Sequence, residues 1–252
     1  MDLDLTKLGR SDLVLLLEVA NRSLLVRDGA EMEGLLRYLC NQVPTQGVVA
    51  GLIPEPSENL KAEEIPFVNV GYSDEWLKKY LARNYFSCDP IKRARLSGAD
   101  FLRWSDTFAR AEKKVEREYI RQAREHDVYE GLTVGAQKHS STLISFFSFI
   151  GTDLASNERD EMMLRYLSPY LHEAMCRATP TASVAKRSPL SERETEVLTW
   201  AMAGKTNWEI SMILNISERT VKFHIQNVMV KLEASSRAHA VAIALGQGLI
   251  CR

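Results

Sequence analysis

The 252-residue chain contains little cysteine and almost no net charge. Its cysteines, Cys40, Cys88, Cys176 and Cys251, lie far apart and form no Cys-x-x-Cys pair. They are too few for a disulfide framework in a chain of this length, and their spacing does not suit a zinc site. We therefore expect reduced thiols, no metal site and a cytoplasmic location. The formal net charge of −1 provides no overall basic field that would indicate a polyanion partner.

Targeting segments, membrane spans and common catalytic motifs are also missing. The first ten residues show no basic stretch followed by an apolar run, so we expect no signal peptide. The apolar segment Leu13–Val26 contains Glu18 and Arg22 and is too short to cross a bilayer, so we expect no membrane partner. A phosphate-binding glycine loop, His-Glu-x-x-His and Gly-x-Ser-x-Gly are absent. We expect a protein that is not an enzyme.

The sequence does contain enough apolar residues to fold. Hydrophobic residues make up 45% and charged residues 26%, close to the globular average, which excludes a disordered chain. Ala178–Pro189 holds two prolines and small polar residues without apolar periodicity, a composition typical of a linker. We predict a domain over 1–178, a linker over 179–189 and a second domain over 190–252.

Charge is distributed unevenly about this linker. Residues 186–252 hold 9 basic and 6 acidic side chains, whereas residues 1–185 hold 23 basic and 27 acidic ones. The C-terminal part is therefore mildly basic and the N-terminal part acidic. Such a difference suggests a polyanion partner for the C-terminal part, although an excess of this size is not diagnostic by itself.

The part before the linker mixes two kinds of periodicity. Helical patterns cover 11–26, 30–41, 74–85, 106–126 and 156–177. Strand-like runs rich in Val, Ile and Phe cover Gly47–Ile53, Ile65–Val70, Leu132–Gln137 and Thr142–Ile150. Their irregular alternation favours a sheet layered with helices. We expect Pro169 to kink or split the last helix.

The part after the linker is helical throughout. Four helices are predicted at 191–203, 206–214, 218–232 and 236–247. Ser191 and Glu194 form a capping box for the first helix, Gly204 ends it, and Ser217 can cap the third.

Two of these helices have the pattern of a helix-turn-helix. Ile210, Ile213 and Leu214 are expected on the inner face of the first. The inner face of the second follows at i, i+4, i+7 and i+11: Val221, Ile225, Val228 and Leu232. Its outer face is then polar, with side chains that can bond phosphates and base edges. A small helical bundle with an ordinary polar surface explains the same pattern.

The residues themselves are more specific than the pattern. Pro189-Leu-Ser-Glu-Arg-Glu-Thr-Glu-Val-Leu, Gly204-Lys-Thr-Asn-Trp-Glu-Ile and Ile216-Ser-Glu-Arg-Thr-Val-Lys-Phe-His together resemble the LuxR-type helix-turn-helix. The resemblance implies that the second helix enters the major groove of DNA. Lys222 and Gln226 would face base edges, matching guanine and adenine respectively by their donor patterns. Phosphate contacts are implied for Thr220, His224, Asn227 and Lys231. Phe223 either contacts a thymine methyl or packs on the domain, and we expect Trp208 in the core or an interface.

A second group of residues lies in the N-terminal part. Trp76 and Tyr80 are four residues apart, Asp89-Pro90 begins nine residues after Tyr80, and Trp104 lies fourteen residues after the proline. An aromatic stripe alone is most simply core, and an aspartate before proline is often a helix cap. The combined spacing, however, resembles the autoinducer-binding domain of LuxR-type quorum-sensing receptors. Later matches to that family are Gly131, Gly135 and Ser148.

This resemblance implies a fold, a ligand and a set of contacts. The fold would be an α+β domain, an α/β/α sandwich with a mainly antiparallel sheet, followed by an all-α four-helix helix-turn-helix domain. The ligand would be an N-acyl homoserine lactone, with no cofactor. Asp89 would accept its amide N–H, and the Trp76 indole would donate to its lactone carbonyl. Tyr72 and Ser148 would donate to the amide carbonyl, while Tyr80 and Trp104 would wall the site.

The resemblance also implies partners. A homodimer would bind a partly palindromic double-stranded DNA site, with the helix at 156–177 as a candidate dimer contact and RNA polymerase as a candidate partner. In the cell the protein would lie in the cytoplasm and on the nucleoid when bound to DNA. The alternative is a regulator with the same DNA-binding module that responds to another small molecule or acts without ligand.

Overall fold

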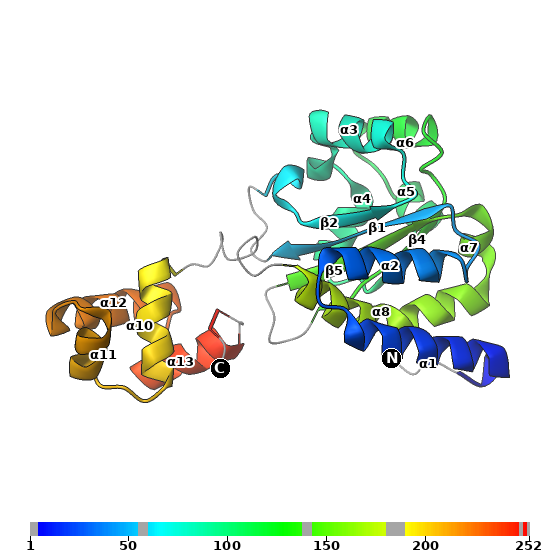
Figure 1. Cartoon of the computed structure of the whole chain (residues 1–252). Helices are drawn as coiled ribbons and strands as arrows, with labels where there is room; N and C mark the ends of the chain where they lie inside the picture. The colour runs from blue at the N-terminus through cyan, green and yellow to red at the C-terminus, as the bar shows by residue number, and fades with distance from the viewer. Residues whose placement is uncertain (1–4, 55–59, 138–142, 180–189, 247–248, 251–252) are drawn as a thin grey trace. The chain divides into compact units, whose positions relative to one another are not determined.

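The computed structural model describes residues 5–54, 60–137, 143–179, 190–246 and 249–250. The chain forms two compact units that divide between residues 183 and 184 (Figure 1). Nearly all of the predicted linker, residues 180–189, lies outside the described residues. Among the helices that are described, none combines the length and the apolar character needed to cross a membrane.

The first unit is built on an antiparallel sheet of five strands. The strands are β1 (Gly47–Pro54), β2 (Phe67–Val70), β3 (Phe101–Arg103), β4 (Gly131–Val134) and β5 (Leu143–Ile150). Their order across the sheet is β2-β1-β5-β4-β3, and every neighbouring pair is antiparallel. The sequence predicted all of these except β3, whose three residues are too few to show alternation.

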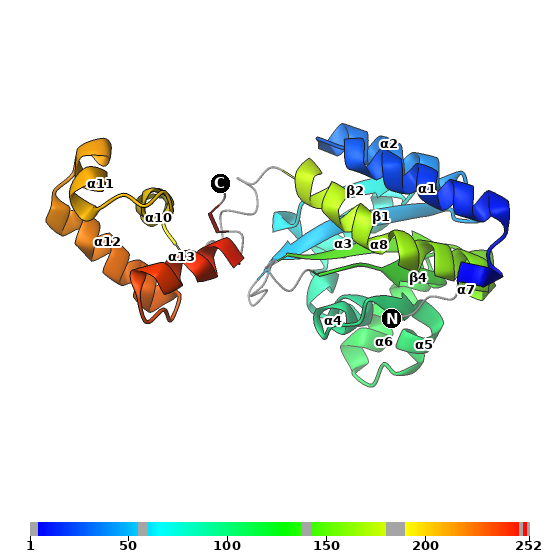
Figure 2. The same ribbon diagram turned by 90° about the horizontal axis from the view of Figure 1, so that it is seen from below.

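Helices cover both faces of the sheet. On one face lie α1 (Arg10–Leu25), α2 (Gly29–Cys40) and α8 (Glu158–Ala178), and Figure 2 shows them on the side opposite α4, α5 and α6. The other face carries α3 (Asp74–Ala82), α4 (Pro90–Leu96), α5 (Trp104–Ala109) and α6 (Lys114–Arg124). Short elements complete the unit: the 3-10 turns Leu5–Lys7, Ala62–Glu64 and Tyr85–Ser87, and helix α7 (Thr152–Ser156). The α+β sandwich expected from the resemblance is confirmed.

Strand β5 separates the interior into two parts. Its odd-numbered residues Phe147 and Phe149 are fully buried in the cluster formed with α1, α2 and α8. Its even-numbered residues Phe146 and Ser148 line a cavity on the other face. Because side chains alternate along a strand, one face of β5 supplies the main core and the other supplies a cavity wall.

One helix prediction for this unit was wrong, and one alternative of another is excluded. Helix α8 runs without a break from Glu158 to Ala178, so Pro169 does not split it. The proline cannot bond the carbonyl of Arg165, but the hydroxyl of Ser168 donates to that oxygen at 3.0 Å. The single helix predicted over 106–126 is instead α5 and α6. Helix α6 starts afresh because buried Glu116 accepts from the backbone N–H of Lys113 and pairs with Arg93.

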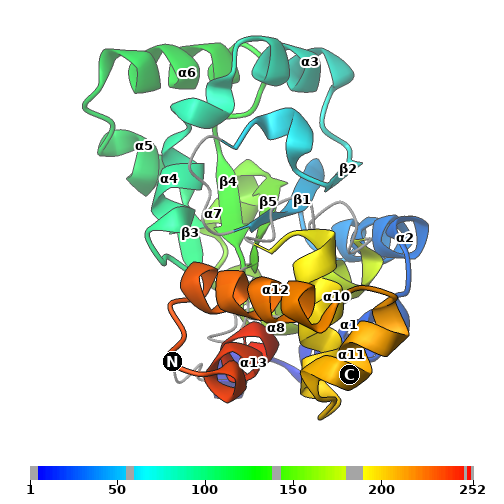
Figure 3. The same cartoon turned by 90° about the vertical axis from the view of Figure 1, so that its left-hand side faces the viewer.

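The described part of the second unit contains four helices around one core (Figure 3). They are α10 (Glu192–Met202), α11 (Asn207–Leu214), α12 (Glu218–Lys231) and α13 (Arg237–Gly246). The predicted caps are confirmed: Ser191 accepts from the backbone of Glu194, Ser217 accepts from the backbone of Thr220, and Gly204 has a φ of +79°. The predicted inner face of α12 is buried.

Candidate functional site

The first unit contains a cavity between its sheet and helices α3–α6. The six residues proposed from the sequence all line it: Tyr72, Trp76, Tyr80, Asp89, Trp104 and Ser148. Most of the remaining lining is apolar, including Ile53, Ile65, Phe86 and Phe146. The predicted residues thus come together around one cavity, from the segment before α3, from α3 itself, from the starts of α4 and α5, and from strand β5.

Helix α3 places Trp76 at the centre of an aromatic cluster. The helix begins at the Ser73 cap, whose hydroxyl accepts from the backbone N–H of Trp76 at 3.1 Å. The Trp76 ring is 2% exposed and lies 6.0 Å from Tyr80 and 5.9 Å from Tyr85, measured between ring centroids. Its indole N–H finds no acceptor among the described residues. This donor is therefore available to a molecule in the cavity.

Asp89 is both the N-cap of α4 and a lining residue of the cavity. One carboxylate oxygen accepts from the backbone N–H of Ile91 at 2.8 Å, and the other accepts from the hydroxyl of Tyr80 at 2.9 Å. Pro90 occupies the first turn of the helix, where its missing N–H costs nothing. Burial raises the pKa of the Asp89 carboxyl, while the hydrogen bonds from Tyr80 and from the backbone lower it. The chain itself therefore holds this acceptor in position, through the predicted helix cap and through a bond from Tyr80 that was not predicted.

Hydrogen-bonded hydroxyl groups on the sheet form another wall of the cavity. The Trp104 indole donates to the Thr133 hydroxyl at 2.8 Å, and that hydroxyl lies 2.9 Å from the hydroxyl of Ser148. The Tyr72 hydroxyl donates to the backbone carbonyl of Ser148 at 3.0 Å. The single O–H of Tyr72 is therefore already donated within the protein, and it would have to leave the Ser148 carbonyl before it could donate to a ligand.

The glycine pair at positions 131 and 135 has a steric basis. A Cβ on Gly131 would lie 2.1 Å from the carbonyl oxygen of Phe149, and one on Gly135 would lie 2.1 Å from that of Ser145. The Gly135 position would also lie 2.6 Å from Nε of Arg95. Only glycine allows β4 and β5 to approach this closely while Arg95 packs against them.

Several lining residues had no signal in the sequence. The hydroxyl of Tyr119, on α6, also interacts with Asp89 and lowers the pKa of its carboxyl. Thr133 on β4 and Arg95 on α4 line the cavity as well. His126, which does not line the cavity, contacts the Trp76 ring, and its Nε2 lies 3.1 Å from Nζ of Lys79. These residues lie on elements far apart in sequence, and nothing local indicates that the elements meet.

In the part of the chain that the structure describes, no three His, Cys, Asp or Glu side chains are grouped so that they could hold a metal ion. Cys40, Cys88 and Cys176 take part in no disulfide among the described residues. Cys251 lies outside the described residues.

The second unit presents α12 as the second helix of a helix-turn-helix. Asn215 ends α11 in the left-handed region with a φ of +51°, which allows the sharp turn into α12. Lys222 and Gln226 are exposed and one helical turn apart, and Phe223 between them is 58% exposed. Asn227 and His224 are half-buried beside them.

Some polar side chains of α12 are buried or bonded within the protein, which limits their contact with DNA. The Thr220 hydroxyl lies 2.7 Å from that of Ser217 within the helix cap. Nδ1 of His224 is buried and has no hydrogen-bond partner in the described chain. Lys231 donates to Glu194 at 2.7 Å, and the Glu194 side chain is only 4% exposed. The fold therefore gives Lys231 a partner within the protein, apart from the phosphate contact proposed for it.

Exposure narrows one prediction about an apolar residue of this unit and contradicts another. Trp208 is 61% exposed, so it does not lie in the core, and its place at an interface stays a prediction. Ile213 is 44% exposed, so the inner face of α11 consists of Ile210 and Leu214.

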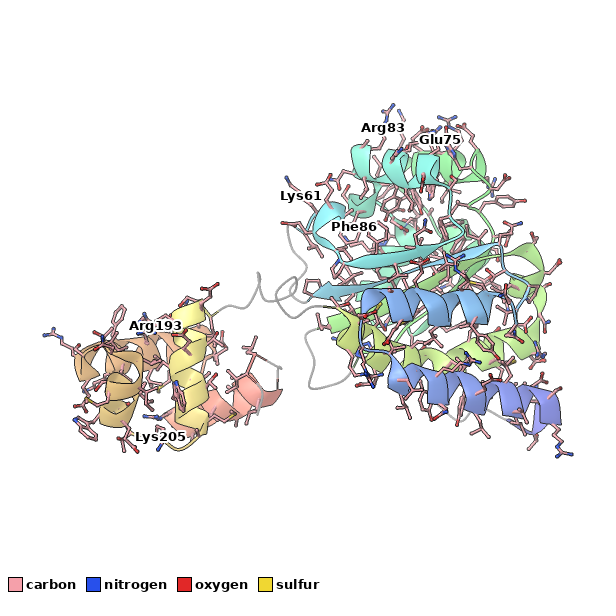
Figure 4. The ribbon with its side chains drawn as sticks, viewed as in Figure 1. Lys61, Glu75, Arg83, Phe86, Arg193 and Lys205 are labelled. Atoms are coloured by element: carbon pink, nitrogen blue, oxygen red, sulfur yellow. The ribbon has the colours of Figure 1, made fainter. Side chains whose placement is uncertain are left out.

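Two arginines bond the ends of α11, a role that was not predicted for them. Arg193, labelled on α10 in Figure 4, donates to the backbone carbonyl of Leu214 at 2.7 Å. Arg237 donates to the Asn207 side chain at 2.7 Å and to the backbone carbonyl of Lys205. Both bonds hold the ends of α11, and through them the angle of the helix-turn-helix.

Comparison with known proteins follows this division into two units. Residues 31–175 match the family described as autoinducer binding domain. Residues 188–244 match the family described as bacterial regulatory proteins, luxR family.

Individual relatives match over most of their length. The quorum sensing-dependent transcriptional regulator RpaR of Rhodopseudomonas palustris is 34% identical over 82% of this chain and 82% of its own. The transcriptional activator SolR of Ralstonia solanacearum is 31% identical over 71% of this chain and 76% of its own. The crystal structure of Escherichia coli SdiA has a TM-score of 0.61 and 23% identity, covering 95% of this chain and 99% of that one, and supports the fold.

These relatives are transcriptional regulators and not enzymes. The autoinducer-binding family model alone covers more than half of the chain, and the second match accounts for the helix-turn-helix. The chain therefore belongs to the LuxR family, as a quorum-sensing transcriptional regulator with an N-terminal autoinducer-binding domain and a C-terminal DNA-binding domain.

Proposed function

We propose that the cavity binds an N-acyl homoserine lactone and that the protein, as a homodimer, then controls transcription from a partly palindromic DNA site. The observation that carries the ligand proposal is the pairing of an unused indole donor with a fixed carboxylate acceptor. Trp76 and Asp89 line the same largely apolar cavity.

The polar groups of the cavity match the polar groups of such a ligand. The lactone carbonyl needs a donor, and the Trp76 indole can only donate. The amide N–H needs an acceptor, and the Asp89 carboxylate is held in place by Tyr80 and the start of α4. A charged acceptor forms a stronger hydrogen bond than a neutral one. The Ser148 hydroxyl would donate to the amide carbonyl, and the Tyr72 hydroxyl would do so only by turning away from the Ser148 backbone carbonyl. Tyr80 and Trp104 would flank the head group.

Calorimetry and thermal unfolding with a panel of acyl lactones test this proposal. Binding stabilises the protein by mass action, by about 2.7 kcal/mol when ligand is present at 100 times its Kd. Trp76→Phe keeps an aromatic ring but removes the donor, and we expect about ten-fold weaker binding. The matched control is Trp200→Phe, a half-exposed tryptophan on α10, which should bind as the wild type does. If no lactone of any chain length binds or stabilises the protein, the proposal fails.

Another acyl compound is the alternative ligand. SdiA, which has a similar fold, has been solved in complex with octanoyl-rac-glycerol (TM-score 0.58, 24% identity). That compound carries hydroxyl groups and an ester where a lactone ligand carries an amide. A hydroxyl can donate to Asp89 as an amide N–H does, so the cavity chemistry admits both. Extraction of bound ligand from protein produced with and without lactones distinguishes them.

DNA recognition is assigned to α12. Lys222 and Gln226 would contact base edges, with Thr220, His224, Asn227 and Lys231 directed at phosphates, as the resemblance implies. Two copies of the chain, each with a linker at 179–189, would place two α12 helices on successive major grooves. RNA polymerase would be a partner on the promoter, and the protein would act in the cytoplasm, on the nucleoid when bound to DNA. Selection of binding sites from random DNA tests this, because a dimer yields sites with two-fold symmetry.

A further inference from the structure

The cavity contains a buried cation that the lactone head group does not use. Arg95, near the end of α4, is 2% exposed and lines the cavity. Its Nε donates to the backbone carbonyl of Ser145 at 2.9 Å, and its Nη1 donates to that of Ala99 at 2.7 Å. Nη2 is buried and has no hydrogen-bond partner among the described residues. Burial lowers the pKa of Arg95, and the nearby charge of Asp100 raises it. The two side chains form no ion pair among the described residues.

Contacts with the backbone hold this guanidinium close to the sheet. The hydrogen bonds to the two carbonyl groups fix the plane of the guanidinium. Gly135 leaves room for the guanidinium, since a Cβ at position 135 would meet Nε and Nη2 of Arg95. A buried guanidinium with an unsatisfied donor is costly, because it has lost water without gaining a full set of partners. An acceptor supplied by a bound molecule would remove that cost.

Arg95 lies apart from Asp89, the acceptor proposed for the head group. It is six positions further along the chain, which corresponds to about 9 Å along the axis of α4. Its anchor Ser145 is three residues from Ser148 on β5, or about 10 Å along the strand. The space between is apolar, with Ile53, Phe86 and Phe146 in one buried cluster. In Figure 4, Phe86 lies between α3 and the sheet, whereas Arg83 points away from the cavity.

We propose that Arg95 selects ligands whose acyl group ends in an oxygen acceptor, a carboxylate above all. This inference rests on the proposed lactone function, because it takes Asp89 and Trp76 to hold the head group. The backbone positions that carry the two contacts lie about 10 Å apart, so an oxygen at the far end of the acyl chain would meet the guanidinium. Hydrogen bonds to a charged donor are stronger than those between neutral groups, so the tail as well as the head would be recognised by polar contacts.

The test uses the full chain and N-acyl homoserine lactones of equal length that end in a methyl, a hydroxyl or a carboxylate group. Titration calorimetry should show that at least one of the oxygen-ended compounds binds about ten-fold or more tightly than the methyl-ended one. Arg95→Met keeps an unbranched stem and removes the donors, so this preference should disappear. Arg83→Met makes the same change at the exposed end of α3, outside the cavity lining, and should keep the preference.

Three outcomes would overturn the inference. Equal affinity of the wild type for all three compounds would remove the role of Arg95 and leave the lactone proposal intact. If Arg95→Met still prefers the oxygen-ended compounds, other residues must cause the preference. Failure of every compound to bind would refute the lactone proposal and this inference together. Because the wild-type series alone measures the preference, the inference can be refuted even if Arg95→Met does not fold.

Discussion

At the scale of single residues, Asp89 shows how a structural group can also serve a binding site. Its carboxylate caps α4 and receives the Tyr80 hydroxyl, so neighbouring donors fix its orientation. A ligand N–H would meet an acceptor that needs no rearrangement, which lowers the entropy cost of binding. The two interpretations of this residue from sequence, helix cap and ligand acceptor, are therefore compatible.

The buried carboxyl of Asp89 makes stability depend on pH. Burial raises its pKa, so the folded state binds the proton more tightly than the unfolded state does. The contribution of Asp89 to stability is then largest below the ordinary aspartate pKa of about 3.9 and is lost as pH rises through the raised value. Asp89→Asn does not titrate, yet its side-chain oxygen can still accept from the backbone of Ile91. As pH rises from about 4, we expect the free energy of unfolding of the wild type to fall relative to that of Asp89→Asn.

Urea unfolding at a series of pH values measures this difference. The same variant should respond weakly or not at all to acyl lactones, because the charged acceptor is gone. A constant difference in unfolding free energy across the series would show that the carboxyl is not destabilised by burial.

Gln226 and Lys222 provide the residue-scale prediction for DNA. Both are exposed on α12, one turn apart. Gln226→Ala and Lys222→Ala should each relax sequence choice at one base pair of a half-site, at a cost of about 1–3 kcal/mol on the preferred base. Binding to a library of single-base variants measures this. Glu192→Ala, on the exposed first turn of α10, is the control. Equal loss of affinity on every sequence would instead indicate a phosphate contact.

At the scale of elements, the second unit depends on bonds between the ends of its helices. Glu194 completes the capping box of α10 and also pairs with Lys231, the last residue of α12. Arg193 bonds the end of α11. The helix-turn-helix is thus held by polar contacts at its corners as well as by the apolar core beneath it.

The pair between Lys231 and Glu194 gives a prediction about stability. Lys231→Met keeps much of the aliphatic stem but leaves the buried Glu194 carboxylate without its cation. We expect a loss of about 1 kcal/mol, less than for a fully buried pair because the Lys231 side chain is 40% exposed. Lys222→Met removes a neighbouring exposed lysine and should leave stability nearly unchanged. Chemical unfolding of both variants decides the point.

The salt dependence of DNA binding then separates the two roles of Lys231. A phosphate contact would add to the slope of affinity against salt, and Lys231→Met would reduce it. An unchanged free energy of unfolding together with a reduced slope would mean that the ion pair contributes nothing and that the phosphate assignment is right.

How well an element could be predicted depended on how local its causes are. Helices α10 to α12 were placed to within one residue at each end because caps and apolar periodicity lie inside each segment. Helix α4 and strand β3 were missed because seven and three residues hold too little pattern. The spacing of Trp76 and Asp89 located the cavity. Tyr119, Thr133 and Arg95 were not predicted, because their place in it depends on how distant elements pack.

At the scale of the whole molecule, regulation requires that events in one unit change the DNA affinity of the other. The division near residue 183 means that the two units have separate cores. A dimer converts such an arrangement into a switch, since two linked DNA-binding units bind a double site far more tightly than either binds half of it. Ligand that favours the dimer would then favour the operator, and ligand that changes the placement of the units would act on the same equilibrium.

Spacing between half-sites tests whether a dimer reads the DNA. Two-fold dimers place their recognition helices about 34–36 Å apart, one turn of about 10 base pairs. Insertion of five base pairs between half-sites turns one half-site to the opposite face of the DNA, and we expect the dimer's advantage over single half-site binding to be lost. Insertion of ten base pairs returns both half-sites to the same face of the DNA but leaves them farther apart. The affinity should therefore recover only in part, to an extent that depends on the reach of the linker. Gel-shift titrations with these duplexes measure both effects. If affinity is indifferent to the insertions, each chain binds its half-site alone, and the homodimer has no part in recognition.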